Sequence, residues 1–274
     1  MFVPFKRKKL AAIIAGGALV GAVVLTGCVD DGVSGLNGQD LNASTLTRLA
    51  TLPLGSEATG LFITDAGDLF FNTQHPSTSN TAPHDKAAVG VINGLNINLL
   101  ADGFTEVAVP TSTEDKQTVK TAVGSYQILI QEGTTLATSG DIAGEIRTAD
   151  GNTVIKQSND PDFNAFLATN AQSTTGYLFT NWEDRPGGMS RIELTKENDG
   201  SWTVGNGMMI DFSSVSGTWV NCFGTLSPWG TPLTSEELYF DNTADWLTPS
   251  YTYFSNPQSL ATYLGYPTDG SGSW

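Results

Sequence analysis

The sequence predicts an all-β domain, and three observations support this prediction. The 274 residues include 30 glycines and 12 prolines, and the polar excess is mostly Thr, Ser, Asn and Gly rather than Lys and Glu, which disfavours long surface helices. Apolar residues come in short bursts separated by turn residues, a pattern typical of many short strands. Only residues 162–171 and 256–264 have a helical pattern, and both segments are short. Together these features predict a sandwich, a barrel or a propeller.

The chain begins with a segment typical of an export signal. A basic stretch at 6–9 precedes an apolar run over 10–25, which ends in Leu-Thr-Gly-Cys28. This pattern predicts a signal peptide over 1–27; an ordinary signal or a short transmembrane anchor is the alternative. The ending resembles the bacterial lipoprotein box, which implies that Cys28 is lipidated and attaches the protein to a membrane. Because Val29 follows instead of Asp, the resemblance favours the outer membrane of the cell envelope, on its periplasmic or external side.

The chain that remains after the predicted leader is strongly acidic. The whole sequence has 13 Lys plus Arg and 28 Asp plus Glu, and four of the cationic residues lie in the leader, so nine remain against 28 and the net charge is −19. This charge excludes binding to nucleic acid or to anionic lipid through bulk charge. Since lipidation uses one of the two cysteines, Cys222 has no intrachain disulfide partner. Its thiol could be a small buried group, a nucleophile or a metal ligand.

The predicted elements follow in chain order. A flexible tether over 28–44, rich in Gly, Asn and Asp, precedes the folded domain over 45–274. The first hairpin spans 60–72, with its turn at 65–67. Further strands are predicted over 87–92, 104–109, 125–130, 153–156, 176–180, 189–194, 202–204 and 238–240.

A weak internal repeat predicts how these strands are arranged. One apolar strand ends at Asn72 and is followed by Thr-Gln-His75-Pro, and another ends at Asn181 and is followed by Trp-Glu183. The repeat predicts blades of a β-propeller whose strand ends point to one shared face. The chain stops in a turn-like Asp-Gly-Ser-Gly-Ser-Trp274, so we expect either a flexible tail or a propeller that is only partly contained in this chain.

The densest group of chemically capable residues lies over 220–237. It contains the thiol of Cys222, two prolines, two glycines, Trp229 and the paired carboxylates Glu236 and Glu237. Pro and Gly disfavour a regular strand throughout, so the segment is predicted to be an ordered loop. A thiolate with carboxylates can bind a transition metal, and carboxylates with carbonyl oxygens suit calcium. The alternative is a tight connection between blades in which both glutamates are solvated.

This segment resembles the signature of the PhoX-type alkaline phosphatases, exported calcium-dependent phosphatases. The resemblance is carried by Asn-Cys-x-Gly-x-x-x-Pro-Trp-Gly-Thr-x-Leu-x-x-Glu-Glu over 221–237. Three further stretches support it: Asn-Trp-Glu at 181–183 with Gly-Gly-Met-Ser-Arg-Ile at 187–192, Val-Gly-Ser-Tyr-Gln-Ile-Leu at 123–129, and Asn-Thr-Gln-His-Pro at 72–76. The resemblance implies a six-bladed β-propeller, incomplete here, in which an iron and calcium cluster hydrolyses small phosphate monoesters.

The same resemblance implies roles for individual residues. Cys222 would bind iron through its thiolate, Glu236 or Glu237 would bind a metal ion, and Glu183 would be a further carboxylate ligand. Trp229 would form a wall of the site. Asn181 is a further candidate for the wall or for a ligand.

Departures from the family pattern keep other functions open. Ser235 stands in place of a second cysteine, Thr225 in place of an expected Gly, and Leu238 in place of an expected polar residue. The ligands expected from later blades have no counterpart in this sequence. A non-catalytic propeller lipoprotein that binds calcium, a glycan or an envelope protein is therefore the second hypothesis. A lactonase-like hydrolase with bound calcium is the third.

Two smaller groups of polar residues have alternative interpretations. His75 and His84 are either metal ligands or members of hydrogen-bonded turns. The acidic segment 159–164 is predicted to cap the helix over 162–171 rather than to bind calcium, because it lacks the Gly and the terminal Glu of a calcium loop.

Overall fold

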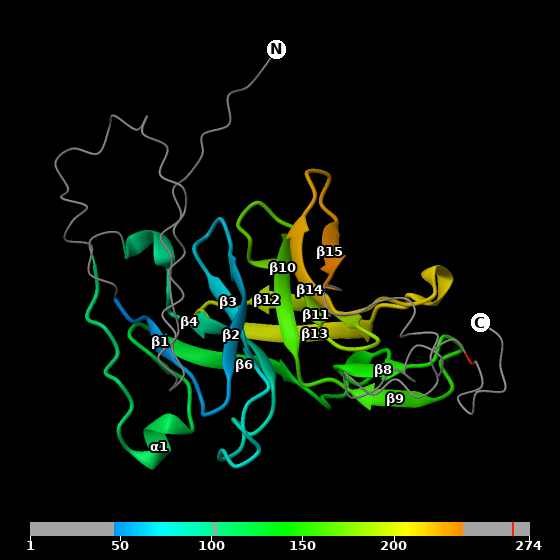
Figure 1. Cartoon of the computed structure of the whole chain (residues 1–274). Helices are drawn as coiled ribbons and strands as arrows, with labels where there is room; N and C mark the ends of the chain where they lie inside the picture. The colour runs from blue at the N-terminus through cyan, green and yellow to red at the C-terminus, as the bar shows by residue number, and fades with distance from the viewer. Residues whose placement is uncertain (1–46, 101–102, 238–264, 266–274) are drawn as a thin grey trace, which may run out of the picture.

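The computed structural model describes residues 47–100, 103–237 and residue 265 (Figure 1). Most of the described elements are strands, which confirms the all-β prediction. The predicted leader, the tether, the strand over 238–240 and the helix over 256–264 lie outside the described residues.

Several of the described strands coincide with predicted segments. The short helices are η2 (Ile97–Leu99), α1 (Thr113–Lys116) and η3 (Ser213–Val215). The strands are β1 (Ala50–Thr51), β2 (Glu57–Ile63), β3 (Leu69–Gln74), β4 (Ala88–Asn93), β5 (Lys120–Thr121), β6 (Ser125–Gln131), β7 (Ala137–Thr138), β8 (Glu145–Arg147), β9 (Val154–Gln157), β10 (Pro161–Ala168), β11 (Thr175–Trp182), β12 (Gly188–Lys196), β13 (Trp202–Met209), β14 (Asn221–Leu226) and β15 (Pro232–Glu236).

Two antiparallel meanders and one hairpin make up most of the fold. The first meander has the strand order β2-β3-β4-β6, and the second has the order β10-β11-β12-β13, with β7 added in parallel to β13. Strands β14 and β15 form the hairpin, and β1-β5 and β8-β9 are small separate pairs. The first strands of the three units are neighbours, because β10 contacts both β2 and β14 (Figure 1). Within residues 47–100 and 103–237 the strands do not close into a barrel or a propeller.

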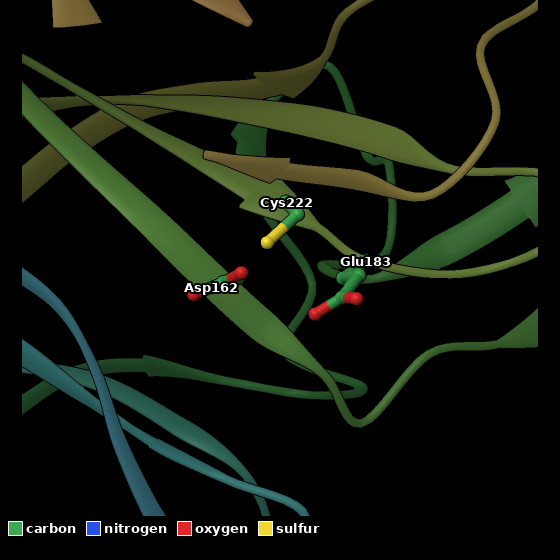
Figure 2. Close-up of side chains that lie close together, drawn as sticks. All are labelled: Asp162, Glu183 and Cys222. Atoms are coloured by element: carbon green, nitrogen blue, oxygen red, sulfur yellow. The ribbon is translucent and has the colours of Figure 1, made fainter. Parts of the chain in front are cut away.

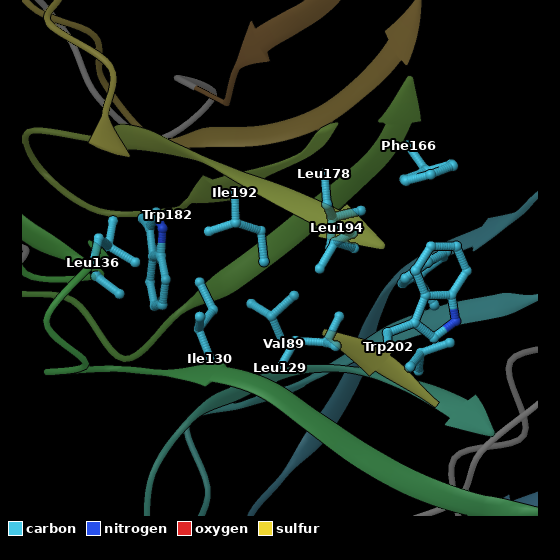
Figure 3. Close-up of a cluster of buried hydrophobic side chains, with 13 residues drawn as sticks. Val89, Leu129, Ile130, Leu136, Phe166, Leu178, Trp182, Ile192, Leu194 and Trp202 are labelled. Carbon is cyan, nitrogen blue, oxygen red and sulfur yellow. The ribbon is translucent and has the colours of Figure 1, made fainter. Parts of the chain in front are cut away.

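The main hydrophobic core contains side chains from both meanders (Figure 3). Leu178, Ile192 and Leu194 are buried on the second meander, where alternate residues of each strand point to one face. Phe70 of the first meander stacks on Phe166 with ring centroids 5.6 Å apart, and Trp202 meets both rings edge-on. This core fixes β10 and β11 against β2 and β3, and it therefore fixes the strands that carry the candidate site.

An ionic contact also links the two meanders. The ammonium group of Lys196, at the end of β12, pairs with the carboxylate of Asp68, in the β2–β3 turn. Asp68 is buried, and Thr64 donates a second hydrogen bond to its carboxylate at 3.2 Å. A buried carboxylate needs such partners, because an unpaired one would be strongly unfavourable.

Two predicted elements were wrong. The segment predicted as a helix over 162–171 is largely strand β10, since it pairs along its length with β11 and buries Ala165 and Phe166 in the core. The spacing of Phe163, Phe166 and Leu167 fits a helix locally, but pairing with β11 and burial in the core determine the structure. The segment predicted as a strand over 104–109 is not a strand in the structure: Phe104 packs against a second hydrophobic cluster, whereas Val109 is 63% exposed.

The predicted loop over 220–237 is instead the β14–β15 hairpin. Its turn contains Pro228 and Gly230, with Gly230 at a φ of +79°. Pro232 is the first residue of β15, a position where proline needs no ladder hydrogen bond. The prolines and glycines thus bound two short strands and do not prevent strand formation.

Candidate metal centre

Three side chains that can bind a metal ion meet where the second meander adjoins the hairpin. They are Asp162 of β10, Glu183 directly after β11 and Cys222 of β14, and each is half-buried. One oxygen of each carboxyl group and the Cys222 Sγ all lie within 4.8 Å of one another. Figure 2 shows the three groups pointing toward one another. The structure therefore brings together two of the sequence-predicted ligands, Glu183 and Cys222.

A repeated asparagine contact positions the two strands that carry ligands. Asn72 of β3 donates its side-chain N–H to the backbone oxygen of Asp162 at 3.0 Å. Asn181 of β11 donates in the same way to the backbone oxygen of Cys222, also at 3.0 Å. Both asparagines are fully buried. In each case the second strand of one unit holds the first strand of the next.

Each ligand-bearing strand is also interrupted at the ligand. The β10–β11 register shifts between Pro161 and Asn164, and the β14–β15 register shifts between Asn221 and Gly224. A β-bulge redirects the side chains of its strand and is common beside functional sites. The bulges thus account for the convergence of two side chains from neighbouring strands that are not paired with each other.

A third asparagine completes the support of β10. Asn164 donates to Asn72 Oδ1 at 2.7 Å, and Thr180 Oγ1 donates to Asn164 Oδ1 at 2.7 Å. Gly60 has a φ of +60°, and a Cβ at this position would lie 2.4 Å from the backbone oxygen of Asp162. Only glycine allows this close approach, which brings β2 against the ligand-bearing part of β10.

The ends of the second strands meet as the sequence repeat predicted. Gln74, at the end of β3, donates to Glu183 Oε2 at 3.2 Å. The backbone N–H of Glu183 donates to Asp160 O at 2.8 Å, and that of Glu237 donates to Val220 O at 2.9 Å. Glu183 and Glu237 thus occupy equivalent positions after β11 and β15. The ends of β3 and β11 therefore lie beside each other.

Burial and neighbouring negative charge raise the pKa values of the carboxyl groups and of the thiol in the cluster. Burial, followed by the negative charge of Asp162, raises the pKa of Glu183 to about 7. Burial also raises the pKa of Asp162, and the charges of Glu57 and Glu237 contribute. The pKa of the Cys222 thiol is raised by burial and by its contacts with Asp162 and Glu237. Without a cation these groups therefore hold their protons to a higher pH than usual, whereas a bound cation would favour their ionised forms.

The structure distinguishes the two adjacent glutamates. Glu236 Oε1 accepts a hydrogen bond from the backbone N–H of Trp219 at 2.7 Å. The Glu237 carboxylate instead contacts the Cys222 thiol and raises the pKa of Glu183. Successive side chains near the end of a strand point in opposite directions, so of this pair Glu237 lies beside the cluster.

The other sequence-predicted residues lie around the cluster or away from it. His75 lies near it, with its Nδ1 3.0 Å from Gly55 O and its Nε2 3.4 Å from Glu57 Oε2. His84 lies in a turn, and burial lowers its pKa. Trp229 lies at the tip of the hairpin and is 74% exposed.

Sequence reasoning missed Asp162, which was predicted to cap a helix. The structure places it in β10, with its carboxyl group in the cluster. A signal was present in the sequence: Asp-Phe-Asn at 162–164 has the same form as Cys-Phe-Gly at 222–224, a potential ligand followed by Phe and a small residue. The shared position relative to the bulges makes the two segments equivalent.

The donor set is suited to a metal ion. A thiolate favours a transition metal such as iron or zinc, and carboxylates bind such metals as well as calcium. The Asn181 side-chain oxygen is buried and has no hydrogen-bond partner among the described residues, so a further oxygen donor lies on the strand next to Cys222. Asp162, Glu183 and Cys222 together could thus hold a metal ion, and their donor types suit more than one class of metal.

No family model, curated protein or solved structure matches the chain. In the part of the chain that the structure describes, no helix has the length and apolar character needed to cross a membrane.

The cluster predicts how the stability of the metal-free protein depends on pH. The pKa of Glu183 is raised from 4.5 to about 7 in the folded protein, so between these pH values the folded state binds more protons than the unfolded state. The free energy of unfolding should therefore fall as the pH rises through this window and remain lower above it. Urea denaturation in a chelator at pH 5 and pH 8 measures the change.

The contribution of the cluster is isolated by substitution. Glu183→Gln cannot lose a proton, so its loss of stability from pH 5 to pH 8 should be smaller than that of the wild type, whereas Glu114→Gln, on α1, should match the wild type. An equal pH dependence in wild type and Glu183→Gln would contradict the prediction.

Proposed function

We propose that this chain is an exported, metal-dependent phosphatase that hydrolyses small phosphate monoesters. The observation that carries the proposal is the convergence of Cys222 with Asp162 and Glu183 at the meeting of β10, β11 and β14. The resemblance of residues 221–237 to the PhoX-type alkaline phosphatases adds to it. Asp162, Glu183 and Cys222 would hold the metal, iron at the thiolate, and Glu237 is a further carboxylate for calcium.

The arrangement of the described strands supports a β-propeller as the architecture. Successive propeller blades are antiparallel meanders whose first strands lie next to one another around an axis. The β2-β3-β4-β6 and β10-β11-β12-β13 meanders and the β14–β15 hairpin have this relation, since β10 contacts both β2 and β14. The repeated contacts of Asn72 and Asn181 are those expected between consecutive blades.

The chemistry needs no serine or histidine nucleophile. A bound metal would neutralise charge on the phosphoryl oxygens and orient the attacking oxygen. In the hydrolysis the bond from phosphorus to the ester oxygen breaks, water supplies a hydroxyl group to phosphorus, and its remaining proton goes to the released alcohol. The amide of Gln74 orients the carboxylate of Glu183, while Asn72 and Asn181 fix the strands that carry Asp162 and Cys222. Held rigidly in this way, the ligands need little rearrangement on binding a metal.

The predicted leader supports an extracytoplasmic location. Lipid at Cys28 would attach the protein to the cell envelope, preferably to the outer membrane. A mature charge of −19 would by itself repel an anionic ester, so metal ions at the site would be needed to attract the substrate.

Phosphatase assays with controlled metal content test the proposal. The purified full chain, loaded with iron and calcium, should hydrolyse 4-nitrophenyl phosphate, lose this activity after chelation and recover it when the metals are restored. Asp162→Asn should lower kcat/KM by at least about 100-fold with an unchanged circular dichroism spectrum, a loss larger than that caused by residues which only orient metal ligands. Glu114→Gln is the matched exposed control.

Elemental analysis separates the alternatives. Absence of hydrolysis by a folded protein that contains stoichiometric iron and calcium would overturn the proposal. Calcium bound without iron, together with no hydrolysis, would favour a binding module, and hydrolysis of lactones alone would favour a lactonase-like enzyme.

A further inference from the structure

A cavity adjoins the metal centre. It has a volume of about 330 Å³ and lies between β2, β10 and β14. Asp162 and Cys222 are part of both its wall and the metal cluster. A group bound at the cluster through Asp162 and Cys222 would therefore have its next atoms in or beside this cavity.

The other side chains of the wall are largely apolar. They come from all three first strands: Leu61, Phe62, Phe163, Phe223 and Leu226. Leu61 is 51% exposed and Phe223 is 67% exposed, although each is a large apolar side chain. Exposed apolar side chains that gather around one cavity, as these do, are a feature of ligand-binding grooves.

The neighbouring backbone leaves room for the phenylalanines. Gly224 lies against the ring of Phe163, and a Cβ at this position would lie 2.6 Å from Phe163 Cδ1. Glycine at 224 thus lets the ring approach the β14 backbone closely. Phe163 follows Asp162 directly, and Phe223 follows Cys222 directly, so the two potential ligands that line the cavity are each next in sequence to an aromatic residue of its wall.

The charge of the wall limits what could bind. None of the described residues that line the cavity is Lys, Arg or His, and Asp162 is its only carboxyl group. A second phosphate of a nucleoside diphosphate or of a polyphosphate would find no cationic partner there. The volume is at the small end of ligand pockets, which range from about 300 to 1,000 Å³, and it suits one or two fused rings.

We propose that this cavity binds the apolar alcohol portion, preferably aromatic, of a phosphate monoester whose phosphate lies at Asp162, Glu183 and Cys222. This inference rests on the proposed function for its substrate, while the cavity itself can be tested without catalysis. The favoured substrates are then phosphate monoesters of aromatic or other apolar alcohols. Polar sugar phosphates and nucleotides with several phosphates are disfavoured.

The test combines binding and kinetics on the full chain. Binding of 1-naphthol to the chelator-treated protein is followed by naphthol fluorescence anisotropy. Hydrolysis of 1-naphthyl phosphate and of glycerol 3-phosphate by the metal-loaded protein is compared through kcat/KM. The variant Phe223→Ala removes one ring from the wall, Phe223→Leu retains an apolar side chain, and Leu99→Ala truncates an exposed apolar residue of η2 outside the wall.

We expect Phe223→Ala to weaken naphthol binding and to lower kcat/KM for naphthyl phosphate by about tenfold each, because a contact of this size between apolar groups is worth about that factor. Phe223→Leu should recover part of the loss. The kcat/KM for glycerol 3-phosphate should change by less than about twofold, and Leu99→Ala should match the wild type on both substrates.

The failures of the two proposals have different signatures. Naphthol binding that Phe223→Ala weakens, in a protein without phosphatase activity, would retain the cavity and overturn the proposed function. Phosphatase activity without naphthol binding, or with equal loss on both substrates in Phe223→Ala, would retain the function and overturn the cavity assignment. Dimers in light scattering that Phe223→Ala dissociates would also overturn it, since a second copy would then cover these side chains.

Discussion

Replacement of Cys222 by alanine is expected to remove the transition metal from the protein and to lower kcat/KM for phosphate monoesters by more than about 100-fold. The thiol is the one soft donor in the cluster, and carboxylates alone bind calcium or magnesium more readily than they bind iron. Iron content should fall from stoichiometric to near zero, whereas some calcium should remain with Asp162, Glu183 and Glu237. Elemental analysis and 4-nitrophenyl phosphate hydrolysis measure the two effects.

The loss of iron and activity can be assigned to the thiol because the Cys222→Ala variant should keep the fold. The Cys222 backbone, through its carbonyl oxygen, accepts the hydrogen bond from Asn181, and alanine retains that oxygen, so thermal unfolding of the metal-free variant should match the metal-free wild type. Ser139→Ala, on an exposed loop, is the matched control for loss of a small polar side chain. Stoichiometric iron in Cys222→Ala would contradict the assignment of the thiol as a ligand.

Replacement of Trp182 by alanine is expected to lower the free energy of unfolding by about 3–5 kcal/mol, the loss typical of a large aromatic residue in a core. Trp182 is fully buried in the core between the meanders (Figure 3). Its indole N–H donates to Ser190 Oγ at 3.0 Å, so the variant also leaves a buried hydroxyl without this partner. Urea denaturation at constant pH and metal content measures the loss.

The same substitution should affect the site. Trp182 lies between Asn181 and Glu183 at the end of β11, so a cavity at this position would loosen the strand end that carries the carboxylate. Metal affinity should fall along with stability. The control is Trp229→Ala, which removes an indole that is 74% exposed and should change the free energy of unfolding by less than about 0.5 kcal/mol. A stability loss in Trp182→Ala no larger than in Trp229→Ala would contradict the packing argument.

Much of the strand content followed from local pattern. Strands β3, β4, β6, β11 and β12 combine apolar β-branched or aromatic residues with turn residues at their ends, and the predicted segments overlap all of them. The prediction was wrong for strand β10, because the spacing of Phe163, Phe166 and Leu167 also fits a helix. Its pairing with β11 is a contact across the β10–β11 turn, which the pattern of a single segment does not specify.

Part of the candidate site could also be predicted from the sequence. Cys222 could be identified because it is the lone thiol after the predicted leader, whereas Glu183 was expected only through the resemblance of residues 181–183 to the PhoX-type phosphatases. Asp162 could not, because an aspartate before an apolar run also fits a helix cap. The distinction between Glu236 and Glu237 depends on the direction of each side chain at the end of β15, and a shift of one residue in register would exchange their roles.

By itself the sequence determined the all-β class, the acidic charge, the candidate thiol and carboxylates, and the repeated strand ends at Asn72 and Asn181. Only the tertiary structure decided that Asp162 meets Cys222, that Glu237 faces the cluster and that an apolar cavity adjoins it. The physical reason is that residue type and alternation are local properties of the chain. Bulges and strand register depend instead on pairing between strands, and the hydrogen bonds of the buried asparagines depend on contacts between segments far apart in sequence.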